Sequence, residues 1–226
     1  MNCIKPPKVL FCATFAFLFV LASSTYYFAK SKLPPSITIE TKGQPTLGYA
    51  KARVHVVVFE EPKCSHCREL NNDLFPIIKK EFIDTNKISY TIVPVSFMPG
   101  SMPAAVAALC IYHQNTLYPN DELFFKFFDY MYQHQPDTGG DWATTQALVD
   151  YAHATSPAIQ LEQLQKCLEM ETYRVQIEQN TAYAKEIMGG SVATPTIYVN
   201  GIMAQDMSPD AIRNLINTVL EHEGIY

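Results

Sequence analysis

Two cysteines stand three residues apart in the segment Cys64-Ser65-His66-Cys67 of this 226-residue chain. The β-branched run Val54–Phe59 predicts a buried strand just before them, and apolar residues three and four apart predict a helix that begins at Cys64. Cysteines at this spacing on a helix face the same side and lie close enough to form a disulfide. The first turn of a helix carries unpaired N–H groups and the positive end of the dipole, which stabilise a thiolate. The segment therefore predicts a redox-active pair with a reactive Cys64.

Charged neighbours modify this expectation. A protonated His66 and the nearby Lys63 stabilise the thiolate further, whereas Glu60 and Glu61 oppose it if they face the same way. A thiolate pKa that is lower by ~3 corresponds to about 4 kcal/mol of preference for the reduced form. At roughly 30 mV per 1.4 kcal/mol, the disulfide becomes about 90 mV more oxidising. We therefore expect the pair to donate its disulfide to a substrate.

The same cysteine spacing also occurs in zinc sites and in structural disulfides, and both alternatives stay open at this point. A zinc site usually needs a second pair of ligands at motif spacing, and His113, His134 and His153 offer no such spacing. A covalent haem site is excluded because Arg68 stands where a histidine is required. The favoured interpretation needs neither a metal nor a cofactor.

The N-terminal residues 1–33 form a separate segment. They contain four lysines and no acid, and Val9–Ala22 is an apolar run of fourteen residues in which only Thr14 is polar. A basic start followed by such a run is typical of a cleaved secretory signal. The run can also be extended to Ala29, which makes it long enough for an uncleaved membrane anchor. Both interpretations place the rest of the chain outside the cytoplasm, where disulfides persist.

The remaining sequence, residues 34–226, reads as one α/β domain. The composition of the full chain is globular, with 48% hydrophobic and 17% charged residues, and its net charge of −5 argues against a nucleic-acid binder. After a lead-in with a short strand expected at Ile37–Glu40, the strand before Cys64 and the helix after it are followed by a strand at Ile88–Val95. Strand, helix and strand in this order predict a parallel sheet.

Residues 101–188 carry only helical signals. Helices are expected from Pro103 to Cys110, over Asp121–Gln133, from a cap at Asp141 to His153, and from Ser156-Pro157 to Gly189-Gly190. The aromatic crowding in residues 121–133 predicts a helical core, with a peptide-binding groove as the alternative.

Strand signals return after Pro195. A strand at Thr196–Asn200 runs through an Asn-Gly turn into Ile202–Ala204, and Ser208-Pro209 begins a final helix. The predicted order of elements in this α/β domain is therefore strand–helix–strand, then an all-helical insertion over about residues 101–188, then strand–strand–helix.

Two stretches carry a family resemblance. The sequence VVVFEEPKCSHC at Val56–Cys67 and the sequence VATPTIYVNG at Val192–Gly201 resemble the DsbA-like branch of the thioredoxin superfamily. The resemblance covers about residues 45–224, including the helical insertion, and it implies a thioredoxin fold. Where many relatives have proline this chain has Ser65, and the strand position that often carries a buried acid is Val58 here.

The resemblance also implies roles for individual residues. Cys64 would be the exposed nucleophile and Cys67 the buried resolving cysteine, and His66 matches the oxidising members. The Thr194–Pro195 bond would be cis and lie beside Cys64, where the Thr194 backbone can bind an extended substrate. A proline that enters a strand cannot pair normally, which agrees with a special conformation at this position.

A second pair of cysteines, Cys110 and Cys167, occupies positions similar to those of an additional pair in some relatives. In an oxidising compartment this implies a structural disulfide, and two free buried cysteines are the alternative.

The function implied by the resemblance is that of an extracytoplasmic thiol:disulfide oxidoreductase. Such a protein introduces disulfides into exported proteins with free cysteines, and a membrane partner reoxidises its site. Two alternatives remain. One is a disulfide isomerase or reductase, which usually needs a dimerisation domain, and the other is a non-catalytic folding or metal-delivery module on the same fold.

Overall fold

The computed structural model describes residues 33–136 and 140–225. The chain divides into two compact units, Met1–Pro35 and Ser36–Tyr226, and the second unit contains the whole fold that follows. The signal or anchor predicted over residues 1–33 lies, apart from Leu33, outside the described residues. Within residues 33–136 and 140–225, none of the helices has the length and apolar character needed to cross a membrane.

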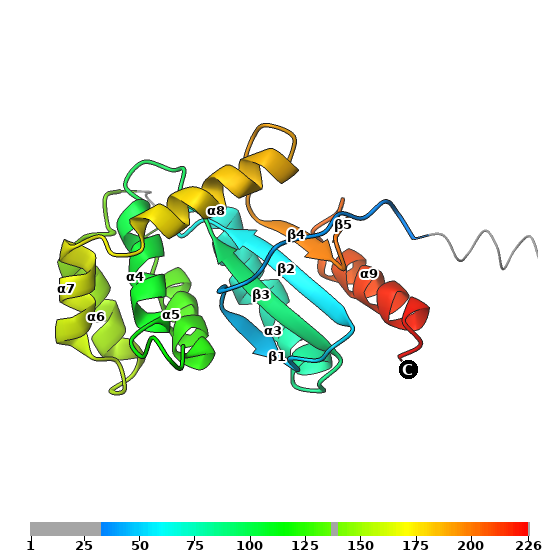
Figure 1. The fold of residues 1–226 in the computed structure, drawn as a ribbon, viewed down its shortest axis with the longest axis horizontal. Helices are drawn as coiled ribbons and strands as arrows, with labels where there is room; N and C mark the ends of the chain where they lie inside the picture. Colours follow the sequence, from blue (N-terminus) through cyan, green and yellow to red (C-terminus); the bar gives the residue numbers. More distant parts are fainter. Residues whose placement is uncertain (1–32, 137–139, 226) are drawn as a thin grey trace, which may run out of the picture. The chain divides into compact units, whose positions relative to one another are not determined.

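The second unit is built on a five-stranded sheet with the strand order β1-β3-β2-β4-β5 (Figure 1). The strands are β1 (Thr46–Gly48), β2 (Val54–Glu60), β3 (Ile88–Pro94), β4 (Thr196–Val199) and β5 (Ile202–Met203). Only the β2–β3 pair is parallel, and the other three pairings are antiparallel. The strand–helix–strand unit is parallel as predicted, and the antiparallel strands β1, β4 and β5 make the sheet as a whole a mixed one.

The strand predicted at Ile37–Glu40 is wrong. That stretch is extended but makes no ladder, and its anchor is a hydrogen bond of 3.0 Å from the Ile37 N–H to the Gly201 carbonyl oxygen. The edge strand is β1 instead, which pairs with β3 through contacts such as Thr46 opposite Thr91.

The crossover between β2 and β3 is one helical stretch in four segments. These are α2 (Ser65–Glu69), the π-helical η1 (Leu70–Leu74), α3 (Phe75–Ile78) and the π-helical η2 (Lys79–Ile83). Pro76 has no N–H to continue the α-helical ladder, and a π-helical turn precedes it, so the hydrogen-bond register of the helix changes at this point. The apolar face forms as predicted, since Leu70, Leu74, Ile78 and Phe82 are buried.

Between β3 and β4 the described residues form five helices. They are α4 (Met102–Tyr112), α5 (Asp121–Gln133), α6 (Thr145–Thr155), α7 (Leu161–Glu169) and α8 (Arg174–Ile187). The first four form the helical region to one side of the sheet, while α8 extends over it (Figure 1). Two predicted boundaries are wrong. Thr144, not Asp141, caps α6 by accepting a hydrogen bond from the Ala147 N–H, and Ser156-Pro157 forms a turn rather than a helix start.

The long helix expected up to Gly189-Gly190 is in fact two helices. The chain breaks between α7 and α8, where Glu171 adopts a left-handed φ of 48°. An L-residue in this conformation cannot continue a right-handed helix, and the intervening turn changes the direction of the chain.

The aromatic residues of α5 fill the helical core, as predicted. Phe124 and Phe128 stack with ring centroids 5.0 Å apart, and Phe128 meets Tyr132 edge-on at 5.1 Å. The helical region also contains a disulfide between Cys110 on α4 and Cys167 on α7. This bond joins α4 to α7 through two cysteines that are 57 positions apart in the sequence.

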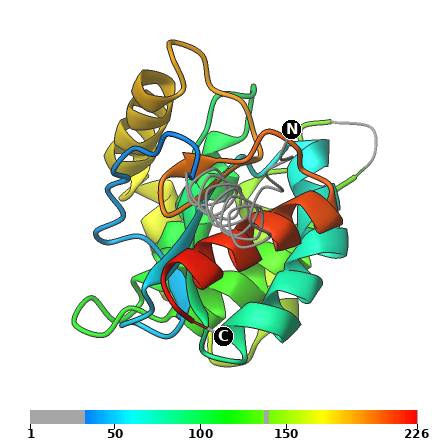
Figure 2. The ribbon, with the colours of Figure 1, turned by 90° about the vertical axis from the view of Figure 1, so that its right-hand side faces the viewer.

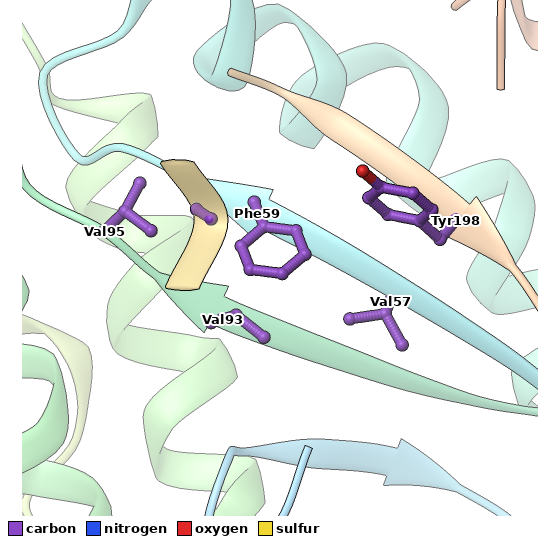
Figure 3. Close-up of a cluster of buried hydrophobic side chains, with 6 residues drawn as sticks. Val57, Phe59, Val93, Val95 and Tyr198 are labelled. Atoms are coloured by element: carbon purple, nitrogen blue, oxygen red, sulfur yellow. The ribbon is translucent and has the colours of Figure 1, made fainter. Parts of the chain in front are cut away.

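The two faces of the sheet are covered by different helices. A buried cluster on one face contains Val57 and Phe59 of β2, Val93 of β3 and Tyr198 of β4, and a piece of α8 crosses it (Figure 3). The final helix α9 (Pro209–His222) contacts β2 and β4, and it lies on a different side from α8 (Figure 2).

The α9 helix begins as predicted, because the Ser208 side chain accepts a hydrogen bond from the Ala211 N–H. The β4–β5 turn is also the predicted one, with left-handed φ values of 45° at Asn200 and 77° at Gly201. A Cβ atom on Gly201 would lie 1.8 Å from the Ile37 carbonyl oxygen, so this position accepts glycine alone for steric as well as conformational reasons.

Candidate active site

Cys64 is the N-cap residue of α2. Its backbone is extended, with φ of −76° and ψ of 121°, and its carbonyl oxygen accepts the hydrogen bond from the Arg68 N–H at 3.1 Å. Because the cap residue precedes the first turn, its side chain lies among N–H groups that have no partner within the helix. Cys64 is half-buried, Cys67 one turn later is buried, and both are free thiols in this structure.

The Thr194–Pro195 peptide bond is cis and lies beside Cys64. The Cys64 thiol donates a hydrogen bond of 3.3 Å to the Thr194 carbonyl oxygen. The sheet brings these distant segments together, because Thr196 of β4 pairs with Phe59 of β2. The two motifs that the sequence singled out therefore form one site.

The two thiols differ strongly in acidity. The hydrogen bond from Cys67 is the largest effect that lowers the pKa of Cys64, to about 5, with further contributions from Thr194 and the backbone N–H groups of Cys67 and His66. Partial burial of Cys64 opposes this shift. Burial raises the pKa of Cys67 well above its usual range. The site thus holds a thiolate at Cys64 and a neutral thiol at Cys67 near neutral pH.

His66 and Ser65 are both exposed at the start of α2. The His66 Nδ1 atom lies 3.0 Å from a Glu69 carboxylate oxygen, and this hydrogen bond raises the pKa of His66, with a smaller contribution from the Cys64 thiolate. The His66 side chain therefore faces Glu69, and its clearest effect on Cys64 is through its backbone N–H. Lys63 donates to the Pro99 carbonyl oxygen at 3.0 Å instead of lying against the thiolate.

Two buried acids near the cysteines were not recognised as site residues from the sequence. Glu60 and Glu61 are 1% and 0% exposed, and each has one carboxylate oxygen, Oε2 and Oε1 respectively, without a hydrogen-bond partner. Burial raises the pKa of Glu60 to about 8 and that of Glu61 to about 7. Both carboxyls therefore hold a proton over much of the range below neutral pH.

The signal for Glu60 is present in the strand pattern. Val54, Val56 and Val58 are all fully buried on one face of β2, and Glu60 continues the same alternation. The strand position at which relatives often carry a buried acid is Val58 in this chain. The acid Glu60 lies two residues later, on the same face of β2.

Two tyrosines complete this buried region. The Tyr132 hydroxyl donates to the Glu61 carbonyl oxygen at 3.3 Å, and a Tyr132 hydrogen bond acts against the raised pKa of Glu60. The negative charges of Cys67 and Glu60 add to burial in raising the pKa of Tyr90 and Tyr132. The site therefore combines a half-buried thiolate at Cys64 with buried acidic groups, Glu60 and Glu61, whose raised pKa values keep them protonated below neutral pH. Within residues 33–136 and 140–225, His, Cys, Asp and Glu side chains form no cluster of three or more that could hold a metal ion.

Comparison with known proteins agrees with this geometry. The family model described as thioredoxin matches residues 40–218. The chain is 35% identical over 182 residues to disulfide bond formation protein D of Bacillus subtilis, which covers 80% of this chain and 78% of that protein. This chain belongs to the thioredoxin family.

Solved structures place it in the DsbA-like branch. The crystal structure of Chlamydia trachomatis DsbA superposes with a TM-score of 0.76 at 36% identity, over 85% of this chain and 100% of that one. Oxidised BdbD from Bacillus subtilis gives a TM-score of 0.74 at 34% identity, over 82% of this chain and 97% of that one. The thioredoxin fold with a helical insertion, predicted from the sequence, is confirmed, and the protein is a DsbA-like thiol:disulfide oxidoreductase.

Proposed function

We propose that this DsbA-like protein works as an oxidase that transfers its Cys64–Cys67 disulfide to exported proteins. The observation that carries the proposal is the position of Cys64 at the N-cap of α2 against Thr194, where its thiolate is stabilised. A stabilised thiolate favours the reduced form of the pair, and the disulfide is correspondingly more oxidising.

The reaction has two exchange steps. A client thiolate attacks the sulfur of Cys64, which forms a client–Cys64 disulfide and releases Cys67 as a thiolate that takes up a proton. A second client thiolate then attacks the client sulfur, which forms the client disulfide and releases the Cys64 thiolate. Two electrons pass from the client to the protein, and the low pKa of Cys64 makes it a good leaving group in the second step.

The other site residues act on binding and position in this scheme. The exposed Ser65 and His66 border the approach to Cys64, and Thr194 and Pro195 lie where an extended client must pass to reach it. Glu60 is close enough to influence the pKa of Cys67 through its charge, so its neutral form assists the formation of the Cys67 thiolate when the disulfide opens. The Cys110–Cys167 disulfide has a structural role in the helical region.

The cycle requires a location and a partner. We place the protein outside the cytoplasm, as a secreted or inner-membrane-anchored periplasmic protein, because residues 9–29 have the composition of a signal or tether. Its clients are unfolded or partly folded exported proteins with free cysteines, and a membrane redox partner reoxidises the reduced pair. The name of the Bacillus subtilis relative, disulfide bond formation protein D, supports the oxidising direction.

The deciding experiment is the reduction potential of the Cys64–Cys67 pair, measured by equilibration with glutathione, together with oxidation of a reduced model client. We expect a potential well above the roughly −270 mV of thioredoxin and rapid oxidation of the client. Replacing Cys64 with alanine should abolish the oxidation. A potential as low as that of thioredoxin, or preferential rearrangement of a scrambled client, would replace the oxidase assignment with a reductase or an isomerase.

A further inference from the structure

A groove runs along the side of the active site, away from the buried acids. It has a volume of about 450 Å³ and lies between α2 and η1 on one side and the Thr194–Pro195 turn on the other, with Met207 before α9 closing its end. Thr194, which accepts the hydrogen bond from the Cys64 thiol, is among the lining residues, so the groove lies next to the reacting sulfur. A chain bound to Cys64 therefore has a recess beside it.

The groove lining carries two carboxylates and one histidine. Glu69 and Asp73 line it, and they stand four residues apart on one helical face. Both are exposed, and no lysine or arginine is among the residues that line the groove. Its histidine, His66, is hydrogen-bonded to Glu69, which leaves Asp73 as a carboxylate without an opposing cation in the groove lining.

Two basic side chains at the start of the helical stretch make hydrogen bonds with backbone carbonyl oxygens. Lys63 donates to the Pro99 carbonyl oxygen, and Arg68 donates to the Gln135 carbonyl oxygen at 3.0 Å. On α9, Arg213 makes ion pairs with Glu81 and Asp210. None of these three residues is among those that line the groove.

The length of an extended client chain determines which of its side chains can reach the carboxylates of the groove. An extended chain advances about 3.3 Å per residue, so a side chain two or three residues from the reacting cysteine lies roughly 7–10 Å from it. We expect such a side chain to reach the groove when the client cysteine is joined to Cys64, because Thr194 contacts the Cys64 sulfur and also lines the groove. A lysine or arginine there combines an apolar stem with a cationic end, and the buried Leu70 and Leu74 form the apolar part of the lining.

We propose that Glu69 and Asp73 determine client specificity, by favouring extended segments that carry a lysine or arginine two or three residues from the reacting cysteine. This inference rests on the oxidase function proposed above and adds a substrate class to it. Electrostatic attraction at an exposed site acts mainly on the rate of association and is screened by salt.

The test compares three peptides with one central cysteine, flanked two residues away on both sides by lysine, by glutamine or by glutamate. The rate of mixed-disulfide formation with the oxidised protein is measured by stopped flow for the wild type and for the Glu69→Gln/Asp73→Asn variant. Basic neighbours also lower the pKa of the peptide thiol itself. The ratio of lysine-peptide to glutamine-peptide rates must therefore be compared between the two proteins, which cancels this intrinsic effect.

A matched control removes the same net charge elsewhere. Asp150 on α6 and Glu162 on α7 are exposed and belong to the helical region, so the Asp150→Asn/Glu162→Gln variant tests for a general effect of net charge. We expect the lysine-to-glutamine ratio to fall about 5-fold in the groove variant at low salt, to stay at the wild-type value in the control, and to lose most of this difference at 0.5 M salt, as expected for about 1 kcal/mol of exposed charge interaction.

The outcomes separate the two proposals. Equal ratios in the wild type and the groove variant, with all three peptides oxidised, would overturn the selectivity while leaving the oxidase function intact. A wild type that reacts with none of the peptides would overturn the oxidase function and the selectivity with it.

Discussion

The Cys64 thiol lies 3.3 Å from the carbonyl oxygen of Thr194, a residue 130 positions away in the sequence. This contact joins the N-cap of α2 to the turn that enters β4, and it exists because β2 and β4 are neighbours in the sheet. A helix N-terminus alone would stabilise the thiolate through backbone N–H groups. The fold adds the Cys67 thiol and the Thr194 side chain to the groups that favour the thiolate, and the result is a pKa of about 5 for Cys64.

Removing the Thr194 hydroxyl should make Cys64 less acidic. The Thr194→Val variant keeps the shape of the side chain but loses a group that lowers the pKa of Cys64. Because Thr194 Oγ1 has no hydrogen-bond partner in this structure, we expect less than the about 1.5–3 kcal/mol of a full hydrogen bond to a charged group, and the pKa should rise by less than about one. The pKa of Cys64 is measured from the pH dependence of its reaction with iodoacetamide. Thr218→Val on α9 is the control, and an unchanged pKa in Thr194→Val would refute the contribution of this hydroxyl.

The buried acid Glu60 should make the oxidised protein less stable as the pH rises. Its folded-state pKa of about 8 lies above the ordinary value of 4.5, so the folded state binds more protons than the unfolded state between these values. The stability is therefore fully present below pH 4.5 and is lost as the pH rises through 8, with Glu61 adding to the effect up to about 7. The expected loss from pH 5 to pH 8 is on the order of 3 kcal/mol for Glu60.

Urea unfolding of the oxidised form at several pH values tests this directly, because the cysteines of the disulfide do not titrate there. The Glu60→Gln variant should show a flatter dependence on pH, whereas Glu162→Gln, which removes an exposed carboxylate, should follow the wild type. A wild-type stability that increases steadily from pH 5 to pH 8 would contradict a raised pKa at Glu60.

Removing the second disulfide should reduce stability without changing the redox chemistry. The Cys110–Cys167 bridge closes a loop of 57 residues between α4 and α7, and the chain-entropy model assigns about 4 kcal/mol to a loop of this size. The Cys110→Ala/Cys167→Ala variant should unfold at lower urea concentration and keep the reduction potential of the Cys64–Cys67 pair. A large change in that potential with stability preserved would show that the bridge takes part in the reaction.

Glycine substitutions should distinguish steric conflict from backbone strain. Gly189 and Gly201 both have left-handed φ values, 80° and 77°, but only a Cβ on Gly201 would meet another atom, the Ile37 carbonyl oxygen. We expect Gly189→Ala to cost about 1 kcal/mol for conformation alone and Gly201→Ala roughly 3 kcal/mol. If both variants lose the same free energy of unfolding, the segment around Ile37 shifts to accommodate the new Cβ atom and the steric conflict does not contribute.

The sequence was informative wherever a local pattern fixes the structure. The apolar alternation of β2, the Asn200-Gly201 turn and the Ser208 cap depend on neighbouring residues, and each formed as predicted. The cysteine pair was placed correctly at the start of a helix for the same reason. These features need no knowledge of the rest of the fold.

The errors arose where distant contacts decide. Ile37–Glu40 has strand composition, but Ile39 packs against the buried cluster on one face of the sheet, so the stretch stays outside the ladder. The helix breaks at Glu171, and α7 can therefore reach α4, where Cys167 is joined to Cys110. The sequence around Glu171 contains no proline or glycine that would have predicted this break. The importance of Glu60 was missed because its burial depends on helices that follow much later, such as α5 with Tyr132.

The most direct test of the central claim is the pH titration of the Cys64 thiolate in the reduced protein, followed by its absorbance near 240 nm against the oxidised form as the reference. The account predicts a single transition with a midpoint near pH 5 that is absent from the Cys64→Ala variant. A midpoint near pH 9, the ordinary value for a cysteine thiol, would contradict it and remove the physical basis for an oxidising disulfide.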